Sequence, residues 1–313
     1  MTDYQTAERM TLKESAIPIP DLADATVLDV GCDHGHWCRL AQKKGASRVL
    51  GLDRGRSVNG QWTDLKEQNR DHEFRSIDLG KQWHEFGKFD VVFCFSMYHH
   101  VFENCGDHNA IWYWLWKHTG KELLWEGPTG KDDSVVKLNV SNDYNAVEIF
   151  DAAQNYFDVD YVGSAKHVKT RHVFRCVPKK LDAVSYLGKA ESGSRGAAKA
   201  FQYAKFRRID EIENALGVRV VPGTLNVRTE RAFDWNRNYY RSQILDVRTR
   251  PGLDGPWLPR WARFYPVMVS GIPAYAFRFE GEGYKDNFVE LIAPVMLRDH
   301  IVRSDNRLYV RSC

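Results

Sequence analysis

The feature that most constrains the fold is a repeated short apolar run that ends in a small or acidic residue and is followed by a helical stretch. Two segments between such runs, HWCRLAQKKGA and NAIWYWLWKHTG, have helical spacing and end near a glycine. Because parallel strands need a crossover that is usually helical, the alternation predicts an α/β Rossmann-like parallel sheet. The strand candidates are ATVLDVG, RVLGLDR, EFRSIDL, FDVVFCFS and KELLWEG, with FDVDYVG and RHVFRCVP as an antiparallel closing pair.

The pattern changes near residues 178–186, where polar and basic residues interrupt the periodicity. A chain of 313 residues is long enough for two domains. We therefore predict a first domain over 1–178, a linker over 179–185 and a second domain over 186–313. After a glycine-rich turn, GKAESGSRGAAKAF, and one helix, RRIDEIENALG, short strands predict a mostly β small barrel. These strands are RVVPGTLNVRT, SQILDVRT, RFYPVMVSG, IPAYAFRFEG, FVELIAP and RLYVRS.

The charge distribution and the composition limit the kinds of ligand and cellular location that the chain can have. Residues 186–313 carry 21 Lys and Arg against 14 Asp and Glu, a balance of +7 in a chain whose net charge is +3. The second domain therefore favours an anionic ligand, either a nucleotide or nucleic acid. There is no apolar run of about 20 residues and no secretory signal pattern, and the six cysteines are too sparse for a disulfide scaffold. We expect a cytoplasmic protein without a membrane partner; the oligomeric state is open.

The segment LDVGCDHGHWC combines a buried strand with a glycine turn and a helix start. Gly31 and Gly35 allow backbone angles that other residues avoid, so the chain can approach a ligand closely. Asp29 at the end of the strand can reach such a ligand. Asp53 ends the next strand, 24 positions further, close to the spacing of a carboxylate that binds ribose hydroxyls. Asp78 follows the third strand and can accept a hydrogen bond from an adenine amino group.

The same segment also raises a metal site as an alternative. Cys32, His34, His36 and Cys38 alternate along it. Side chains at i and i+2 diverge on a turn that runs into a helix, and the cysteines lack the CxxC spacing of zinc sites. We therefore favour a nucleoside pocket, with the two histidines bordering the cofactor or exposed.

The glycine-turn segment, Asp53 and Asp78, together with FDVVFCFSMYHHV in the fourth strand region, resemble the class I S-adenosylmethionine-dependent methyltransferases. The resemblance covers about residues 20–178. The resemblance implies S-adenosylmethionine as cofactor. It places the methionine part beside the glycine turn, the ribose at Asp53 and the adenine at Asp78. The implied cofactor-binding residues are Asp29, Gly31, Cys32, Gly35, Asp53, Arg54, Asp78, Leu79 and Ser96.

Two positions are candidates for contact with the methyl acceptor. His99 and His100 follow the fourth strand, at the edge where such folds bind substrates, and a histidine can remove a proton from a hydroxyl. A role for them in starting a helix or in packing is the alternative. Glu126 ends the fifth strand and is the second candidate. The signatures NPPY and DPPY of amino-group methylation on bases are absent, which favours a small-molecule acceptor.

A second candidate site lies in the tetrapeptide GTLN of the second domain. Thr224 and Asn226 are two residues apart, so in an extended chain both face the same side. A hydroxyl and an amide carbonyl are oxygen ligands suited to Mg²⁺. A turn followed by two polar strand residues is the alternative interpretation.

GTLN with RAFD, the segment GKAESGSRGAAKAF and the segment VELIAPVMLRDHIVRSDNRLYV resemble the archaeal CTP-dependent riboflavin kinases over about residues 186–313. The resemblance implies CTP and Mg²⁺ as ligands, with Thr224 and Asn226 on the metal and Glu290 as base near the acceptor hydroxyl. The segments SGSRGAA and GEGYKDNF depart from the family pattern, so the acceptor need not be riboflavin. The nucleotide site would be lined by Gly188, Lys189, Gly193 and Gly196.

We therefore predict a bifunctional enzyme that transfers a methyl group from S-adenosylmethionine and phosphorylates a hydroxyl with CTP, both on small molecules. One alternative is an RNA methyltransferase whose basic second domain only binds substrate. Others are a methyltransferase with a non-catalytic ligand-binding barrel, and an interaction protein that binds the cofactor without catalysis.

Overall fold

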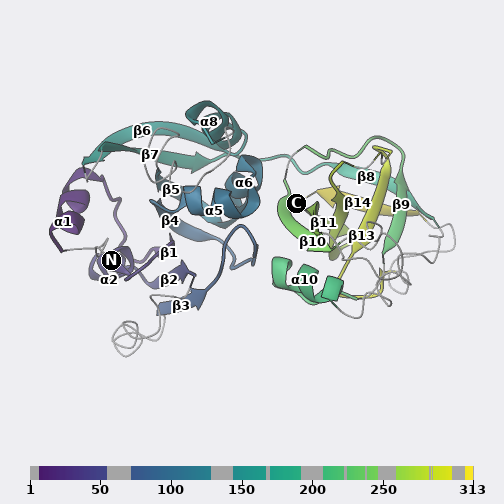
Figure 1. Ribbon diagram of the computed structural model, residues 1–313, viewed down its shortest axis with the longest axis horizontal. Helices are drawn as coiled ribbons and strands as arrows, with labels where there is room; N and C mark the ends of the chain where they lie inside the picture. The colour runs from purple at the N-terminus through teal and green to yellow at the C-terminus, as the bar shows by residue number, and fades with distance from the viewer. Residues whose placement is uncertain are drawn as a thin grey trace. The chain divides into compact units, whose positions relative to one another are not determined.

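The chain forms two compact units, each described by itself below (Figure 1). The first consists of Met1–Gly80 and Phe86–Lys180, and the second of Lys81–Glu85 and Leu181–Cys313. The structure is a computed structural model. It describes residues 7–54, 72–127, 144–166, 170–191, 207–221, 224–236, 238–245, 259–281, 283, 285–297 and 307–312.

A seven-stranded sheet in the order β3-β2-β1-β4-β5-β7-β6 forms the centre of the first unit. Strands β1 to β5 are parallel, and β7 runs antiparallel to both β5 and β6. The predicted parallel sheet with an antiparallel closing pair is thus confirmed. The strands are β1 (Thr26–Val30), β2 (Arg48–Asp53), β3 (His72–Ser76), β4 (Phe89–Phe95), β5 (Thr119–Glu126), β6 (Phe157–Lys166) and β7 (Thr170–Pro178).

Helices cover both faces of this sheet. Its helices are α1 (Ala7–Ala16), α2 (His36–Lys43), α5 (Tyr98–Cys105), α6 (His108–His118) and α8 (Ala146–Gln154). Helix α2 packs on β1 and β2, while α6 packs on β4, β5 and α8. Phe93 and Phe95 alternate along β4 and join Trp37 of α2 in one buried cluster. This packing leaves the carboxyl ends of five parallel strands at a common edge, where doubly wound folds bind ligands.

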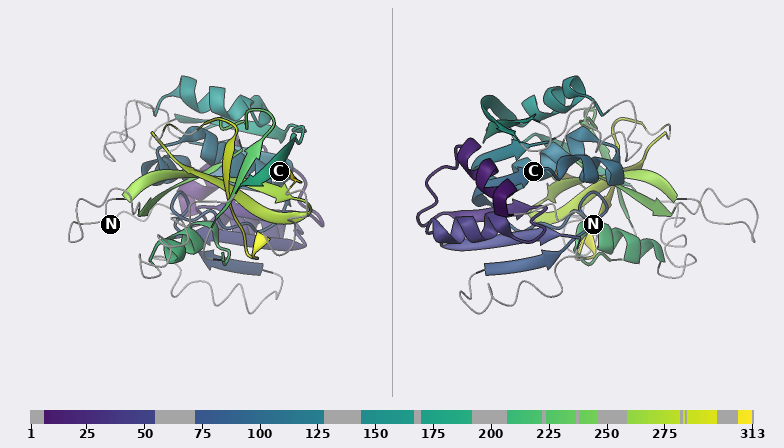
Figure 2. Two further views of the ribbon diagram at one scale, coloured as in Figure 1. Left: turned by 90° about the vertical axis from the view of Figure 1, so that its right-hand side faces the viewer. Right: turned by 60° about the vertical axis from the view of Figure 1, so that its left-hand side comes forward.

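The second unit is a small barrel, as predicted. Six antiparallel strands close in the order β11-β12-β13-β9-β8-β14 and back to β11, and β10 pairs with the first half of β11. In the left view of Figure 2 the green and yellow strands of this unit cross steeply, as barrel strands do. The elements are β8 (Ser185–Glu191), α10 (Arg207–Leu216), β9 (Leu225–Thr229), β10 (Tyr240–Leu245), β11 (Pro259–Val269), β12 (Ile272–Phe279), β13 (Phe288–Ile292) and β14 (Arg307–Ser312). None of the described helices in either unit is long and apolar enough to cross a membrane.

The segment Lys81–Glu85 is part of the second unit, although the predicted division left it in the first domain. Trp83 is fully buried there and stacks on Tyr240 of β10, with 5.7 Å between ring centroids. Its indole Nε1 donates to the carbonyl of Arg241 at 3.0 Å, and its backbone N–H donates to the carbonyl of Ala215 at 2.5 Å. The segment therefore supplies a core side chain that residues 181–313 do not contain.

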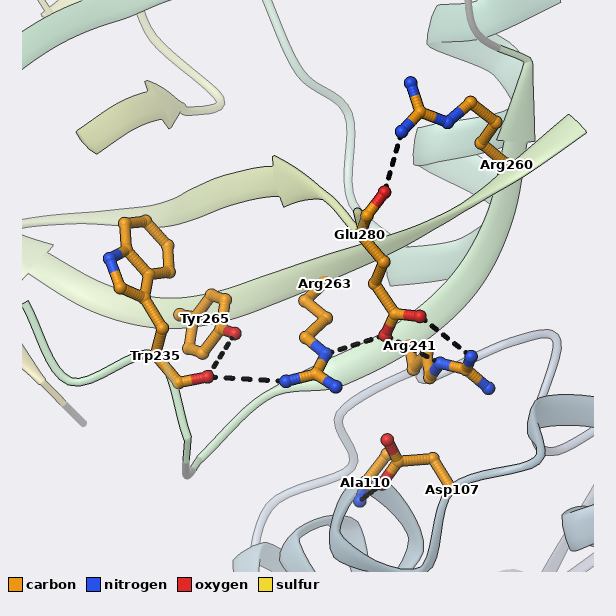
Figure 3. A network of polar contacts seen from close by, with 8 residues as sticks. All are labelled: Asp107, Ala110, Trp235, Arg241, Arg260, Arg263, Tyr265 and Glu280. Carbon is orange, nitrogen blue, oxygen red and sulfur yellow. Dashed lines mark hydrogen bonds and ion pairs between the residues drawn. The ribbon is translucent and has the colours of Figure 1, made fainter. Parts of the chain in front are cut away.

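A row of ion pairs joins β10, β11 and β12 (Figure 3). The Glu280 carboxylate accepts hydrogen bonds from Arg241 at 2.8 and 2.9 Å and from Arg263 at 2.7 Å. Arg260 donates to the backbone carbonyl of Glu280 at 2.7 Å. Burial acts to raise the pKa of Glu280, but the hydrogen bonds from the two arginines outweigh it and lower that pKa. One carboxylate, directly after β12, thus links side chains of β10 and β11.

Candidate functional site

The turn between β1 and α2 has the conformation that its glycines allow. Gly31 and Gly35 have φ angles of 79° and 72°, and Asp33 between them has a φ of 43°. The backbone N–H groups of Gly31 and Cys32 both donate to the carbonyl of Leu52, which holds the turn against β2. A Cβ on Gly31 would lie only 2.6 Å from Cγ of Met97. The turn is therefore in close contact with the segment after β4.

Two members of the predicted cofactor set face inward instead. Asp29 is 1% exposed, and it accepts a hydrogen bond from the thiol of Cys38 at 3.3 Å. Cys32 is also 1% exposed, and its Sγ fills the space above Gly51. Alternation along β1 places Asp29 on the face that α2 covers, and the assignment of these two residues to the cofactor site stays a prediction. Burial raises the pKa of Asp29 to about 7, although the Cys38 thiol opposes this shift.

The buried Asp29 carboxyl predicts a pH-dependent stability. In the unfolded chain its pKa is near 3.8, so between about pH 4 and 7 the unfolded state ionises while the folded state keeps its proton, and the folded state loses stability as pH rises. The loss is complete above about pH 7 and amounts to about 4 kcal/mol. We expect Asp29→Asn to remove most of this loss, measured as the free energy of unfolding in urea between pH 4 and 8. If the free energy of unfolding depended on pH in the same way in the wild type and in Asp29→Asn, the prediction would be contradicted. Asp151→Asn, at an exposed position on α8, is the control and should follow the wild type.

The two carboxylates assigned to ribose and adenine lie close to the turn. Asp53 accepts the backbone N–H of Asp33 at 2.8 Å and that of Arg54 at 2.6 Å. Arg54 Nε lies 3.9 Å from Asp78 Oδ1. Asp53, Arg54 and Asp78 thus form one contiguous polar edge after β2 and β3.

The border of that edge is fixed by a side chain that the sequence did not single out. Asn104 of α5 donates from Nδ2 to Asp78 Oδ1 and to the carbonyl of Leu79, both at 2.8 Å. Asn104 therefore orients the two residues assigned to the adenine.

The four histidines of the two motifs lie in different surroundings. His99 and His100 both lie in the first turn of α5, the helix-start position that the sequence analysis gave as the alternative, and His99 is buried. The pKa of His100 is lowered, chiefly by burial and then by the positive charge of Arg54, which places His100 near the ribose edge. His36 Nε2 lies 2.6 Å from Glu14 Oε1 of α1, whereas His34 Nε2 lies 3.9 Å from Asp33. His34 and His36 thus have separate acidic neighbours, whereas the rings of His99 and His100 lie against each other with centroids 4.1 Å apart.

A buried polar cluster lies at the carboxyl ends of β4 and β5. Glu126 is fully buried, and its Oε2 accepts hydrogen bonds from Ser96 Oγ at 2.8 Å and from Lys13 Nζ at 2.9 Å. Arg171 Nη1 donates to Ser96 Oγ at 2.8 Å and lies 3.7 Å from Glu126 Oε1. Ser96 has a φ of 59°, a conformation that non-glycine residues rarely adopt. Oε1 of Glu126 has no hydrogen-bond partner in the described part of the protein.

Sequence analysis found Ser96 and Glu126 of this cluster but missed both cations. Lys13 is 1% exposed although lysine is rarely buried, and it belongs to α1, for which no strong pattern was found. Arg171 stands at the start of β7, more than 40 residues beyond Glu126 along the chain. A lysine within a helix and an arginine within a strand carry no local signal of burial. Only the tertiary fold brings them to one carboxylate.

In the second unit the predicted metal ligands and base occupy one face. Thr224 precedes β9 and donates from Oγ1 to Asn226 Oδ1 at 3.4 Å. Asn226 lies directly opposite Glu290 of β13, and on its other side opposite Glu191 of β8. Directly opposite residues project to the same face of a sheet. Oxygen-bearing side chains from three strands are thus brought together, and Glu191 is a member that sequence analysis missed.

The first residues of the predicted glycine-rich turn are part of a strand instead. Gly188 lies inside β8, and a Cβ there would come within 2.5 Å of Val227 Cγ1. Gly188 is therefore a position of close strand packing, and Lys189 beside it is exposed; their assignment to the nucleotide site stays a prediction. The predicted Pro222-Gly223 turn, Gly193 and Gly196 lie outside the described residues.

Two family models match separate parts of the chain. A family model described as a methyltransferase domain matches residues 6–103. The model of the CTP-dependent riboflavin kinase family, described as a domain of unknown function (DUF120), matches residues 194–308. No curated protein sequence matches the chain.

Several solved structures are similar to about half of the chain. One is an S-adenosylmethionine-dependent methyltransferase from Mesorhizobium loti, with 16% identity, a TM-score of 0.43, and coverage of 55% of this chain and 98% of that chain. Another is the N-methyltransferase NodS from Bradyrhizobium japonicum WM9 in complex with S-adenosyl-L-homocysteine, with 10% identity, a TM-score of 0.42, and coverage of 55% and 85%. The chain therefore contains an N-terminal methyltransferase domain followed by a C-terminal domain of the CTP-dependent riboflavin kinase family.

Proposed function

We propose that the first unit transfers a methyl group from S-adenosylmethionine to a hydroxyl or amine of a small molecule. The observation that carries this proposal is Oε1 of Glu126, a buried carboxylate oxygen that has the Arg171 charge 3.7 Å away but accepts no hydrogen bond from the described residues. It lies at the strand edge where such folds bind substrates. A buried acceptor of this kind is costly unless a donor meets it. An O–H or N–H group of the methyl acceptor would be that donor.

The residues of the neighbouring edge fit the cofactor. The 31–35 turn offers close backbone approach, Asp53 suits two ribose hydroxyls, and Asp78 held by Asn104 suits an adenine amino group. Contact of Met97 with Gly31 brings the segment that carries Ser96 next to this turn. Bound S-adenosylmethionine would supply an electrophilic methyl group there.

Glu126 is the proposed proton acceptor. Lys13 and Ser96 hold its Oε2 in place, which leaves Oε1 to receive the proton that the acceptor loses. Lys13 and its neighbour Glu14, which pairs with His36, also make α1 one wall of this site. His100, whose pKa is lowered, lies nearer the ribose edge, which supports a binding role for it.

For the second unit we propose phosphorylation of a small-molecule hydroxyl with CTP and Mg²⁺. The shared face of Thr224, Asn226 and Glu290 supports it, because Mg²⁺ takes such oxygen ligands together with phosphates. Phosphoryl transfer depends mainly on positioning and charge neutralisation, so this set with nearby cations is sufficient.

Replacing Glu126 with glutamine tests the first proposal. We expect Glu126→Gln to lower methyl transfer from radiolabelled S-adenosylmethionine into a protein-free metabolite extract by roughly 100-fold or more, the usual contribution of a positioned base. The affinity for S-adenosylmethionine, measured by calorimetry, should stay unchanged and shows that the variant is folded. Glu103→Gln, on α5 outside the cluster, is the matched control. Wild-type transfer rates in Glu126→Gln, or no transfer by the wild type, would refute the proposal.

A further inference from the structure

Three basic residues form one cross-strand row on the second unit. Arg307 of β14 lies directly opposite Lys189 of β8, and Lys189 lies directly opposite Arg228 of β9. Strands β8 and β9 are labelled side by side in Figure 1. The three side chains project to the same face, where Lys189 and Arg307 are exposed and Arg228 is partly buried. Like charges directly opposite each other destabilise a sheet, so an anion bound along this row would relieve the repulsion.

The row adjoins the face of the proposed magnesium ligands. Asn226 and Arg228 are two residues apart on β9 and so point to the same side, about 7 Å apart along the strand. Lys189 and Glu191 have the same relation on β8. Across these strands a row of cations therefore runs parallel to a row made of Glu191, Asn226 and Glu290.

Arg228 is oriented by its neighbours. Its Nε lies 2.6 Å from Glu191 Oε1 and its Nη2 lies 3.2 Å from Glu191 Oε2, a two-pronged contact that fixes the guanidinium plane. The guanidinium carbon also lies 5.9 Å from the centroid of the Phe288 ring. Glu191 thus links the two rows, because it positions Arg228 while standing beside Asn226.

The geometry points to a triphosphate site on this face. We propose that the phosphate chain of a nucleoside triphosphate lies along Arg307, Lys189 and Arg228, with its Mg²⁺ on the side of Thr224 and Asn226. The inference rests on the proposed nucleotide-dependent function of this unit and adds Arg307 and Arg228, two arginines to which the sequence analysis assigned no role. A magnesium triphosphate needs cations that contact its phosphate oxygens and oxygen ligands that hold its Mg²⁺. The first row offers the cations and the second row offers the oxygen ligands. Glu191 is then a positioning residue, which acts through Arg228.

Calorimetric titration of the full chain tests the site. The probes are CTP, inorganic tripolyphosphate and cytidine, each with Mg²⁺. We expect Arg307→Gln, Lys189→Gln and Arg228→Gln each to raise the Kd for CTP and for tripolyphosphate about 10-fold, the loss of one charge-assisted contact. The Kd for cytidine should stay unchanged. Arg311→Gln is the matched control, because Arg311 lies on the same strand and face as Arg307 but opposite Ser185.

The two proposals fail in different ways. If the wild type binds CTP and both Arg307→Gln and Lys189→Gln bind it equally well, the triphosphate row is refuted while the nucleotide function stands. If the wild type binds neither CTP nor tripolyphosphate, the nucleotide function fails and the row fails with it. Arg307→Gln and Lys189→Gln change exposed side chains, so folding of these variants is expected to be normal.

Discussion

Trp83→Ala is expected to lower the free energy of unfolding of the second unit by about 3–5 kcal/mol, the usual cost of deleting a buried large aromatic side chain. Trp83 is fully buried, stacks on Tyr240 and donates to the Arg241 carbonyl, so its removal leaves a cavity and removes one hydrogen bond. Hydrogen exchange of the amides in α10 and β10 measures the effect, since these elements contact the 81–85 segment.

Gln82→Ala is the matched control for this experiment. Gln82 is the neighbouring residue, and its side chain donates to the exposed side chain of Asn214 at 2.7 Å. We expect it to change stability by less than about 1 kcal/mol. Equal protection of β10 in Trp83→Ala and Gln82→Ala would show that the segment is not part of the core of this unit.

Asp53→Ala is expected to weaken S-adenosylmethionine binding by roughly 100-fold or more. Hydrogen bonds to a charged group contribute about 1.5–3 kcal/mol each, and the ribose offers two hydroxyls. The change also frees the Asp33 N–H that Asp53 holds, which loosens the glycine turn. Asp53→Asn keeps the size and one acceptor oxygen, so an intermediate loss is expected. Calorimetric titration of each variant measures the affinity.

Binding of CTP should be unaffected by Asp53→Ala, because the residues proposed for the two ligands belong to different units. Asp151→Asn, at an exposed position of α8, should bind S-adenosylmethionine as the wild type does. Unchanged cofactor affinity in Asp53→Ala would contradict the assignment of this carboxylate to the ribose.

Local patterns were sufficient for the sheet of the first unit and for much of the barrel. The apolar runs that end at Asp53 and Glu126 became β2 and β5, because β-branched and apolar residues favour buried strands whatever lies around them. Strand β8 was missed, since Gly188 within SYLGKAE suggested a turn. The structure shows that this glycine makes room for Val227 on the next strand, a contact that no local pattern contains.

Some residues of the candidate sites could be recognised from the sequence, and others only from the tertiary fold. Residues at strand ends, such as Asp53, Asp78 and Asn226, were recognised from position alone. Lys13 and Arg171 were not, because their roles come from partners 113 and 75 residues away. Asp29 was placed in the ligand site by its motif, but strand alternation turns it toward Cys38. The sequence thus locates an edge of the sheet, and tertiary packing decides which side chains face it.

The central claim is that one chain carries two separate nucleotide-dependent sites, and calorimetric titration of the wild-type protein tests it most directly. S-adenosylmethionine and CTP with Mg²⁺ are each titrated alone and then in the presence of a saturating amount of the other. The account predicts that each ligand binds once per chain at micromolar concentration and that neither displaces the other. Absence of binding by either ligand, or displacement of one by the other, would contradict it.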